Sequence, residues 1–342
     1  MNETHSIKTG MAKKSANYEG SLSSGANFVS LNGWNIPNDY GSTLDEYLSF
    51  KEKTGITDFS DSGVVSLQGK DAADFLHKMT TNNMLNINPN EPIVTVLTDA
   101  DGHFVDVITV LLRNDRFLLI GSEGNGQNIF EWLDKYHFSE EITIVDESGK
   151  YGLFALYGGK ATDILSSQEY LLIGSDDESA FILVENNVPS VWAKLVESGL
   201  TPAGREAWNL IRTERGIPRF GFEIIGSANP LEAGFTHAVS FTKGCYIGQE
   251  VIARMDTYDK VSRELRRLHF SEKVDKSGHK LLTKDGKPAG EITTSVYSPE
   301  LGKQIGLGYV KKKYIELGGE LSVSGTDLTA VIGEGFLEES KI

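Results

Sequence analysis

The chain has 342 residues, a formal net charge of −15 and one cysteine. A net negative surface repels a phosphate backbone, so we expect no nucleic-acid partner. No apolar run reaches the roughly 20 residues needed to span a bilayer and the N-terminus lacks the order of a secretory signal, so we expect a cytoplasmic protein without a membrane partner.

The start of the chain combines a polar segment with a short helical pattern. Residues 1–26 are rich in Ser, Gly, Asn and Lys, and we predict that they form a flexible tail. Leu44, Tyr47 and Leu48 then share one helical face. This spacing predicts a short helix that leads into the first folded unit.

The segment 56–149 has the pattern of a compact α/β unit. A helix is predicted to start at Asp71, and a second one contains Ile129, Trp132 and Leu133. Strand patterns occupy residues 64–67, 93–97, 104–112, 117–120 and 142–145. The resulting β-α-β-β-β-α-β order is typical of a ferredoxin-like split βαβ sandwich.

Residues 121–126 are glycine-rich, follow a strand and open a helix, as phosphate-binding loops do. The glycine spacing differs from the dinucleotide fingerprint, and no Lys-Ser/Thr pair follows. We interpret this stretch as a plain turn.

The remainder of the chain divides into two parts. Strands are predicted at 153–156 and 181–184, and helices at about 189–198 and 203–215. From about residue 264 onward, short strands alternate with Ser-Gly, Asp-Gly and Ser-Pro turns, which is typical of an all-β barrel or sandwich.

The single cysteine, Cys245, stands in the octapeptide Lys-Gly-Cys-Tyr-Ile-Gly-Gln-Glu at 243–250. One thiol supplies neither an internal disulfide nor the ligand set of a cluster or structural zinc, so no metal site is expected. Lys243 would favour the thiolate that a nucleophile or ligand requires. The alternatives are a small buried Cys245, or a strained turn that needs Gly244 and Gly248. Tyr246 could equally pack against the barrel.

A basic cluster interrupts the acidic composition. It consists of Arg254, Lys260, Arg263, Arg266 and Arg267. Two interpretations stay open, a solvated basic face and a seat for an anionic ligand tail or acidic partner.

The octapeptide, followed by Arg254, resembles the hallmark of the YgfZ-type folate-binding proteins. The wider chain, from about residue 27 to the end, is similar to the superfamily that these proteins share with the glycine-cleavage T-protein, an aminomethyltransferase. The matching segments include residues 33–34, 40–42, 58–60, 67–72, 212–218, 290–295 and 307–310.

This resemblance implies an α+β fold in which three domains form a ring around a folate pocket. The first domain is discontinuous, consists of residues 27–55 and 150–262, and carries the octapeptide. The ferredoxin-like unit of residues 56–149 is inserted into it. Residues 263–342 form a C-terminal β-barrel.

The resemblance also implies a function. The chain would bind tetrahydrofolate and support assembly or repair of iron–sulfur clusters in client or assembly partners. The alternative is an aminomethyltransferase that passes a one-carbon unit from an aminomethyl-lipoyl carrier to tetrahydrofolate; a folate-dependent demethylase is a third option. Cys245 and Lys243 would be reactive groups at the pocket rim, and Arg254 and Tyr246 would contact the folate.

Asp106 is the remaining candidate, both for catalysis and for folate binding. It shares a strand face with Phe104 and Ile108, whereas Val105 and Val107 take the other face. A carboxylate on an apolar face needs a ligand or a donor to meet it. By resemblance it would accept a hydrogen bond from a folate amine. The alternative is an edge-strand aspartate in solvent.

Three departures from the T-protein pattern count against aminomethyl transfer and leave the folate pocket in place. Ser60 leads into Asp61-Ser62, where T-proteins have Ser-His-Met. Residues 175–181 replace the segment that carries a folate-binding glutamate in T-proteins. The paired aspartates are reduced to Asp106-Val107.

Overall fold

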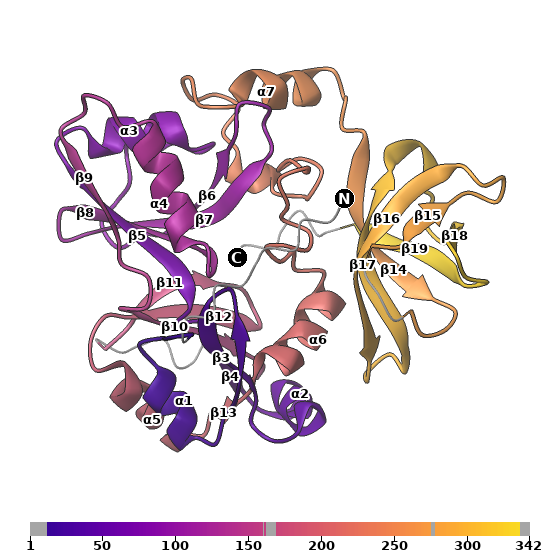
Figure 1. Ribbon diagram of the computed structural model, residues 1–342, viewed down its shortest axis with the longest axis horizontal. Coiled ribbons are helices and arrows are strands. Elements are labelled where there is room, and N and C mark those ends of the chain that lie inside the picture. Colours follow the sequence, from indigo (N-terminus) through magenta and orange to yellow (C-terminus); the bar gives the residue numbers. More distant parts are fainter. Residues whose placement is uncertain (1–11, 160, 162–168, 275–277, 336–342) are drawn as a thin grey trace.

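The computed structural model describes residues 12–159, 161, 169–274 and 278–335. Three units surround a set of central loops (Figure 1), as expected for the α+β, three-domain fold. Among the described residues, no helix is both long enough and apolar enough to cross a membrane.

The first unit is built on a five-stranded sheet of order β11-β12-β10-β4-β13. The strands are β4 (Gly55–Asp58), β10 (Gly152–Tyr157), β11 (Leu171–Ser175), β12 (Ser179–Val184) and β13 (Thr201–Pro202). Side chains alternate along β10, so Phe154 and Leu156 pack with helix α5 (Val188–Glu197), while Ala155 and Tyr157 pack with α2 (Thr43–Glu52) and α6 (Arg205–Arg215). Both faces of the sheet are therefore buried.

The predicted flexible tail is wrong for residues 12–26. They contain β1 (Lys13–Lys14) and α1 (Tyr18–Ser23), and β1 pairs with β3 (Trp34–Asp39), which in turn pairs with β2 (Asn27–Leu31). Asn17 and Ser21 are buried and donate hydrogen bonds of 3.0 and 2.9 Å to Asp58. Polar side chains, and not an apolar face, hold this segment in place. Its polar composition therefore resembles that of a flexible tail. Residues 1–11 lie outside the described part of the chain.

The second unit is the predicted ferredoxin-like insert. Its elements are β5 (Ser62–Gly69), α3 (Ala72–Met79), β6 (Ile93–Thr98), β7 (Phe104–Arg113), β8 (Arg116–Glu123), α4 (Gly126–Lys135) and β9 (Ile142–Asp146). The sheet order is β6-β7-β8-β5-β9, and all neighbours are antiparallel. Without the edge strand β6, this is the order of a split βαβ sandwich. The sheet starts at Ser62, because β4 pairs with β10 in the first unit.

The third unit is a closed six-stranded barrel, which confirms the prediction for the C-terminal part. Its strands are β14 (Arg263–Phe270), β15 (Lys280–Leu282), β16 (Pro288–Ser298), β17 (Lys303–Lys311), β18 (Glu320–Val323) and β19 (Thr329–Gly335). Leu268, Ile292, Val310 and Ile332 belong to its core. Residues 336–342 of the predicted barrel domain lie outside the described chain.

Residues 216–248 form the central loops and contain a short 3-10 turn, Thr236–Ala238. Helix α7 (Gln249–Thr257) then leads toward the barrel, above the insert in Figure 1. The sequence pattern does not predict α7, because only Ile252 is buried and the helix has no continuous apolar face.

Candidate functional site

A cavity of about 220 Å³ lies where the insert, the first unit and the central loops meet. Its walls are mainly apolar, and all three parts contribute to them. Val107 and Ile120 come from the insert, Leu153 and Phe181 from the first sheet, Trp208 from α6, and Phe220 and Phe235 from the central loops. Among the described residues, the barrel contributes no side chain to this cavity.

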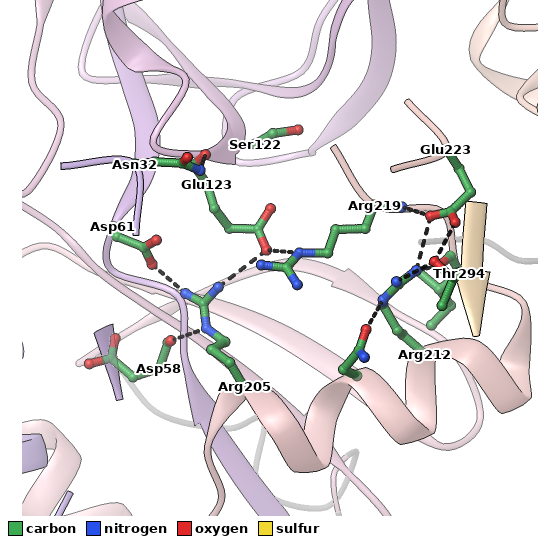
Figure 2. A network of polar contacts seen from close by, with 12 residues as sticks. Asn32, Asp58, Asp61, Ser122, Glu123, Arg205, Arg212, Arg219, Glu223 and Thr294 are labelled. Atoms are coloured by element: carbon green, nitrogen blue, oxygen red, sulfur yellow. Dashed lines mark hydrogen bonds and ion pairs between the residues drawn. The ribbon is translucent and has the colours of Figure 1, made fainter. Parts of the chain in front are cut away.

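One polar cluster at the cavity wall is centred on Arg205, whose side chain is 5% exposed. Its guanidinium lies 3.8 Å from the centroid of the Phe59 ring and donates to the backbone carbonyl oxygen of Asp58 at 2.9 Å. It also pairs with Asp61 and, at 3.2 Å, with Oε1 of Glu123 (Figure 2). Arg205 therefore joins the N-terminus of α6 to the end of β8.

Asp61 is fully buried beside this arginine. Burial raises the pKa of its carboxyl to about 6, and the charge of Arg205 acts in the opposite direction. The carboxyl of Asp61 is thus one half of a buried ion pair with Arg205.

A second cluster links α6 to the barrel. The Arg212 side chain is 2% exposed and donates to Glu223 at 3.0 Å and to Thr294 at 2.9 Å. Both oxygens of Glu223 are occupied, since Oε2 also accepts from the backbone N–H of Arg219, and Oε1 accepts from Thr293 and Thr294. All hydrogen-bonding atoms of the Glu223 carboxylate thus have partners, and the cluster fastens the barrel to α6 and to the central loops (Figure 2).

Asp106 does not line the cavity. Its Oδ2 accepts from the Ser122 N–H and the Asn125 amide, both at 2.9 Å, and its Oδ1 accepts from the Ser122 hydroxyl at 2.6 Å. Burial raises the pKa of this carboxyl to about 6, and these hydrogen bonds act in the opposite direction. Strand alternation instead turns its neighbour Val107 toward the cavity. The geometry gives Asp106 the task of fixing the turn between β8 and α4, so the turn interpretation of 121–126 has a structural reason.

Lys243 is bound by backbone oxygens. Its ammonium donates to the carbonyls of His77, Thr80 and Asn82 at the end of α3, with distances of 2.6 Å to Thr80 and 2.8 Å to Asn82. Burial lowers the pKa of Lys243 to about 8. A favourable helix C-terminus and three acceptors hold the ammonium there. The lysine therefore clamps the octapeptide to the insert.

The glycines of the octapeptide play different parts. Gly248 has a φ of +83°, and a Cβ there would lie 2.5 Å from the carbonyl oxygen of Asp99. Gly248 therefore matches the strained-turn alternative. Gly244 is not among the residues with positive φ.

Cys245, Tyr246 and Arg254 also lie outside the lining of the central cavity. Cys245 is exposed. Tyr246 is buried with Val239 and Ile252 rather than against the barrel core, and burial raises its pKa to about 12. Arg254 is exposed and pairs with Glu250 at 2.9 Å, one turn away on α7. Among the described residues, the octapeptide therefore neither lines the cavity nor donates a hydrogen bond to Asp106.

The basic cluster is largely neutralised within the protein. Arg263 pairs with Glu232 at 3.0 Å, Arg266 pairs with Glu264, and Arg267 donates to the carbonyl oxygen of Arg215 at 2.7 Å. The contacts of Arg263 and Arg267 hold β14 against the central loops and α6, whereas the pair of Arg266 and Glu264 lies within β14.

Arg205 and Glu123 are not among the residues predicted from sequence. A positive charge in the first turn of a helix opposes the helix dipole, and Arg205 is the first residue of α6. That local conflict indicates that the side chain has a partner elsewhere. Nothing local indicates Glu123, which lies 82 residues away in the chain.

Comparisons with known proteins agree with this architecture. The GCVT N-terminal domain model matches residues 18–177, and the glycine cleavage T-protein C-terminal barrel domain model matches residues 263–332. The crystal structure of glycine cleavage system aminomethyltransferase T from Bartonella henselae shares the fold, with a TM-score of 0.83, 22% identity, and coverage of 97% of this chain and 99% of that chain.

Relatives that match most of this chain are named as transferases. A putative chloroplastic transferase of Arabidopsis thaliana is 30% identical over 317 residues, which covers 85% of this chain and 73% of the relative. An aminomethyltransferase of Thermosipho melanesiensis is 28% identical over 327 residues, covering 87% and 89%. The chain therefore belongs to the glycine cleavage T-protein family, whose members here include several aminomethyltransferases.

Proposed function

We propose that the protein binds reduced folate in the central cavity and is a tetrahydrofolate-dependent transferase of one-carbon units. The observation that carries this proposal is the cavity itself, which has apolar and aromatic walls and a carboxylate, Glu123, at its edge. Sites of this kind accept flat heteroaromatic rings that carry a few polar groups. The relatives named aminomethyltransferase support the transferase class.

The volume defines which part of the ligand would enter. At about 220 Å³, the cavity is smaller than the roughly 300–1,000 Å³ typical of sites that enclose a whole drug-sized ligand. It would take the bicyclic pterin ring, and the aminobenzoyl-glutamate tail would remain outside.

Transfer from an aminomethyl-lipoyl carrier needs little chemistry from protein groups. The carbon–sulfur and carbon–nitrogen bonds of the aminomethyl group both break, and the carbon bonds to N5 and N10 of the folate. The two protons that these nitrogens lose leave with ammonia and with the free dihydrolipoyl thiol. In this proposal the cavity holds the folate nitrogens in position, so that proximity and orientation supply most of the rate enhancement.

Support of iron–sulfur cluster assembly or repair is the second candidate. The exposed Cys245 in an octapeptide of the YgfZ type favours it, because this thiol is accessible to a partner protein and is not part of the cavity lining. A single thiol holds a cluster only together with ligands from another protein.

Two measurements test these functions. Anaerobic titration with tetrahydrofolate should quench the fluorescence of Trp208 at the cavity wall. Val107→Phe, which fills the cavity, should abolish binding, whereas Cys245→Ser, outside it, should bind normally. Wild-type protein that does not bind tetrahydrofolate would overturn the proposal.

Turnover separates the two candidates. A loaded aminomethyl-lipoyl carrier should yield methylenetetrahydrofolate and ammonia above a blank without enzyme. Folate binding without turnover, together with loss of cluster-enzyme activity in a Cys245→Ala strain, would favour the second candidate.

A further inference from the structure

The Glu123 carboxylate is divided between two environments. Its Oε1 faces two guanidinium groups, those of Arg205 at 3.2 Å and Arg219 at 3.3 Å. Its Oε2 accepts no hydrogen bond from the described residues, and Figure 2 shows it directed away from both arginines. Glu123 lines the cavity, and its side chain is only 14% exposed. Oε2 of Glu123 is therefore free to accept a hydrogen bond from a ligand that enters the cavity.

Charge balance indicates what kind of group that is. The cluster contains two cations, Arg205 and Arg219, and two carboxylates, Asp61 and Glu123. Of the other ionisable lining residues, Arg212 is neutralised by Glu223, and burial lowers the pKa of His237, which favours its neutral form. Since no net charge needs a counter-ion, the expected contact is a neutral hydrogen-bond donor.

Glu123 is also held in a defined orientation. Arg205 is fixed by Asp61, by the carbonyl oxygen of Asp58 and by the face of Phe59, so it has little freedom to follow a displaced carboxylate. Arg219 approaches the same oxygen from the central loops. Two cations on Oε1 therefore aim Oε2, which is the preorganisation that a recognition group needs.

We propose that Oε2 of Glu123 recognises the exocyclic amino group of the bound pterin ring, and that Arg205, held by Asp61, is the positioning residue for this contact. The inference rests on the proposed function, because it names the group that reads the folate ring. The ligand class is a fused heteroaromatic ring that carries an amino group next to a ring N–H. The amino group and the ring N–H on this edge are both hydrogen-bond donors, and an ionised carboxylate has only acceptors, so the two are complementary.

The expected size of the effect follows from the type of hydrogen bond. A hydrogen bond to a charged acceptor contributes roughly 1.5–3 kcal/mol, which corresponds to an affinity change of about 10- to 100-fold. In Glu123→Gln the amide oxygen must face the two guanidiniums, because its NH₂ group would oppose their N–H donors. The amide NH₂ would then face the cavity and meet the amino group of the ligand, donor against donor.

The test is a comparison of two ligands, tetrahydrofolate and its 2-deamino analogue. Wild-type protein should bind the analogue about 10- to 100-fold more weakly than tetrahydrofolate. Glu123→Gln should bind the two ligands within about threefold of each other, since the discriminating acceptor is lost. Glu131→Gln, an exposed change on α4, is the matched control and should discriminate like the wild type.

Two further variants separate recognition from folding. Arg205→Lys keeps the charge but loses the fork that aims Glu123, so it should lose discrimination while its affinity for the deamino analogue changes little. Glu123→Asp keeps the negative charge but has a side chain one methylene shorter. It should also lose the discrimination between the two ligands and change the affinity for the deamino analogue little. Thermal unfolding of each variant checks that it is folded.

The failures are distinguishable. Protein that binds no tetrahydrofolate overturns both the proposed function and this inference. Protein that binds tetrahydrofolate, with equal discrimination in the wild type and in folded Glu123→Gln or Glu123→Asp, overturns the role of Glu123 alone. An Arg205→Lys variant that binds both ligands more weakly by the same factor overturns the positioning role of Arg205.

Discussion

Two arginine–glutamate pairs lie at opposite ends of α6, and they differ in how completely they are satisfied. Arg212 and Glu223 form a closed cluster in which both carboxylate oxygens have partners within the protein. Arg205 and Glu123 form an open one, in which Oε2 has no partner among the described residues. The same pair of side chains can therefore serve as a fastening in one place and as a recognition element in another.

The cost of burial explains this difference. A buried ion pair is stable only when further hydrogen bonds satisfy its remaining atoms. Glu223 is 0% exposed and has those bonds, whereas the Glu123 side chain is 14% exposed at the edge of a cavity. Water or a ligand can donate the missing hydrogen bond to Oε2 of Glu123. One can therefore replace the other without destabilising the fold.

The largest expected effect is in the closed pair. Glu223→Gln should lower the free energy of unfolding by about 3–5 kcal/mol, because it leaves the buried Arg212 charge without its counter-ion. Urea unfolding would measure this, with Glu123→Gln as the matched change in the open pair and an expected loss below about 1 kcal/mol. Equal losses for the two variants would remove the distinction between a fastening and a recognition element.

A second prediction concerns the contact between the octapeptide and the insert. Lys243→Met should lower the free energy of unfolding by about 2–3 kcal/mol, because three carbonyl oxygens at the end of α3 lose a charged donor. Hydrogen exchange should also become faster around 243–248. Lys243→Arg is the comparison that keeps the charge. A Lys243→Met variant with unchanged stability and exchange would show that the clamp has no energetic role.

The fold could be predicted from sequence wherever one periodicity dominated. The alternating strands and amphipathic helices of the insert gave every element of the split βαβ order, and the turn-rich C-terminal part gave the barrel. Helix α1 and the residues before it escaped prediction because Asn17 and Ser21 attach them through hydrogen bonds to Asp58, and polar contacts of this kind leave no hydrophobic pattern.

The site was harder to predict, for two physical reasons. Alternation placed Asp106 and Val107 on opposite faces of β7, but both faces of this sheet are covered, so the pattern could not tell which face meets the cavity. The contact of Arg205 with Glu123 joins residues 82 positions apart. Such a contact is created by tertiary packing, and no local pattern encodes it.

The pH dependence of stability tests the open pair in another way. Asp61 has a pKa of about 6 in the folded protein, above its ordinary 3.8, so the folded state takes up this proton at higher pH than the unfolded chain. Its contribution to the free energy of unfolding is therefore greatest below about pH 4 and declines as the pH rises to about 6.

Asp61→Asn should flatten this part of the pH profile by on the order of 1–2 kcal/mol, measured by urea unfolding at several pH values. Asp106, whose pKa is also about 6, contributes with the same sign and should leave a residual slope. A slope identical to that of the wild type would mean that Asp61 is ionised throughout this range and that Arg205 dominates its titration.

The smallest effect is expected at Cys245. Because the thiol is exposed and lies outside the cavity lining, Cys245→Ser should change the free energy of unfolding by less than about 0.5 kcal/mol and leave tetrahydrofolate affinity unchanged. The informative measurement is then activity of iron–sulfur enzymes in cells that carry only this variant. Loss of that activity from a stable, folate-binding protein would assign the thiol to a partner and not to the cavity. Full activity would mean that the octapeptide has only the structural roles of Lys243 and Gly248. The proposed folate site would then be the functional centre of the molecule.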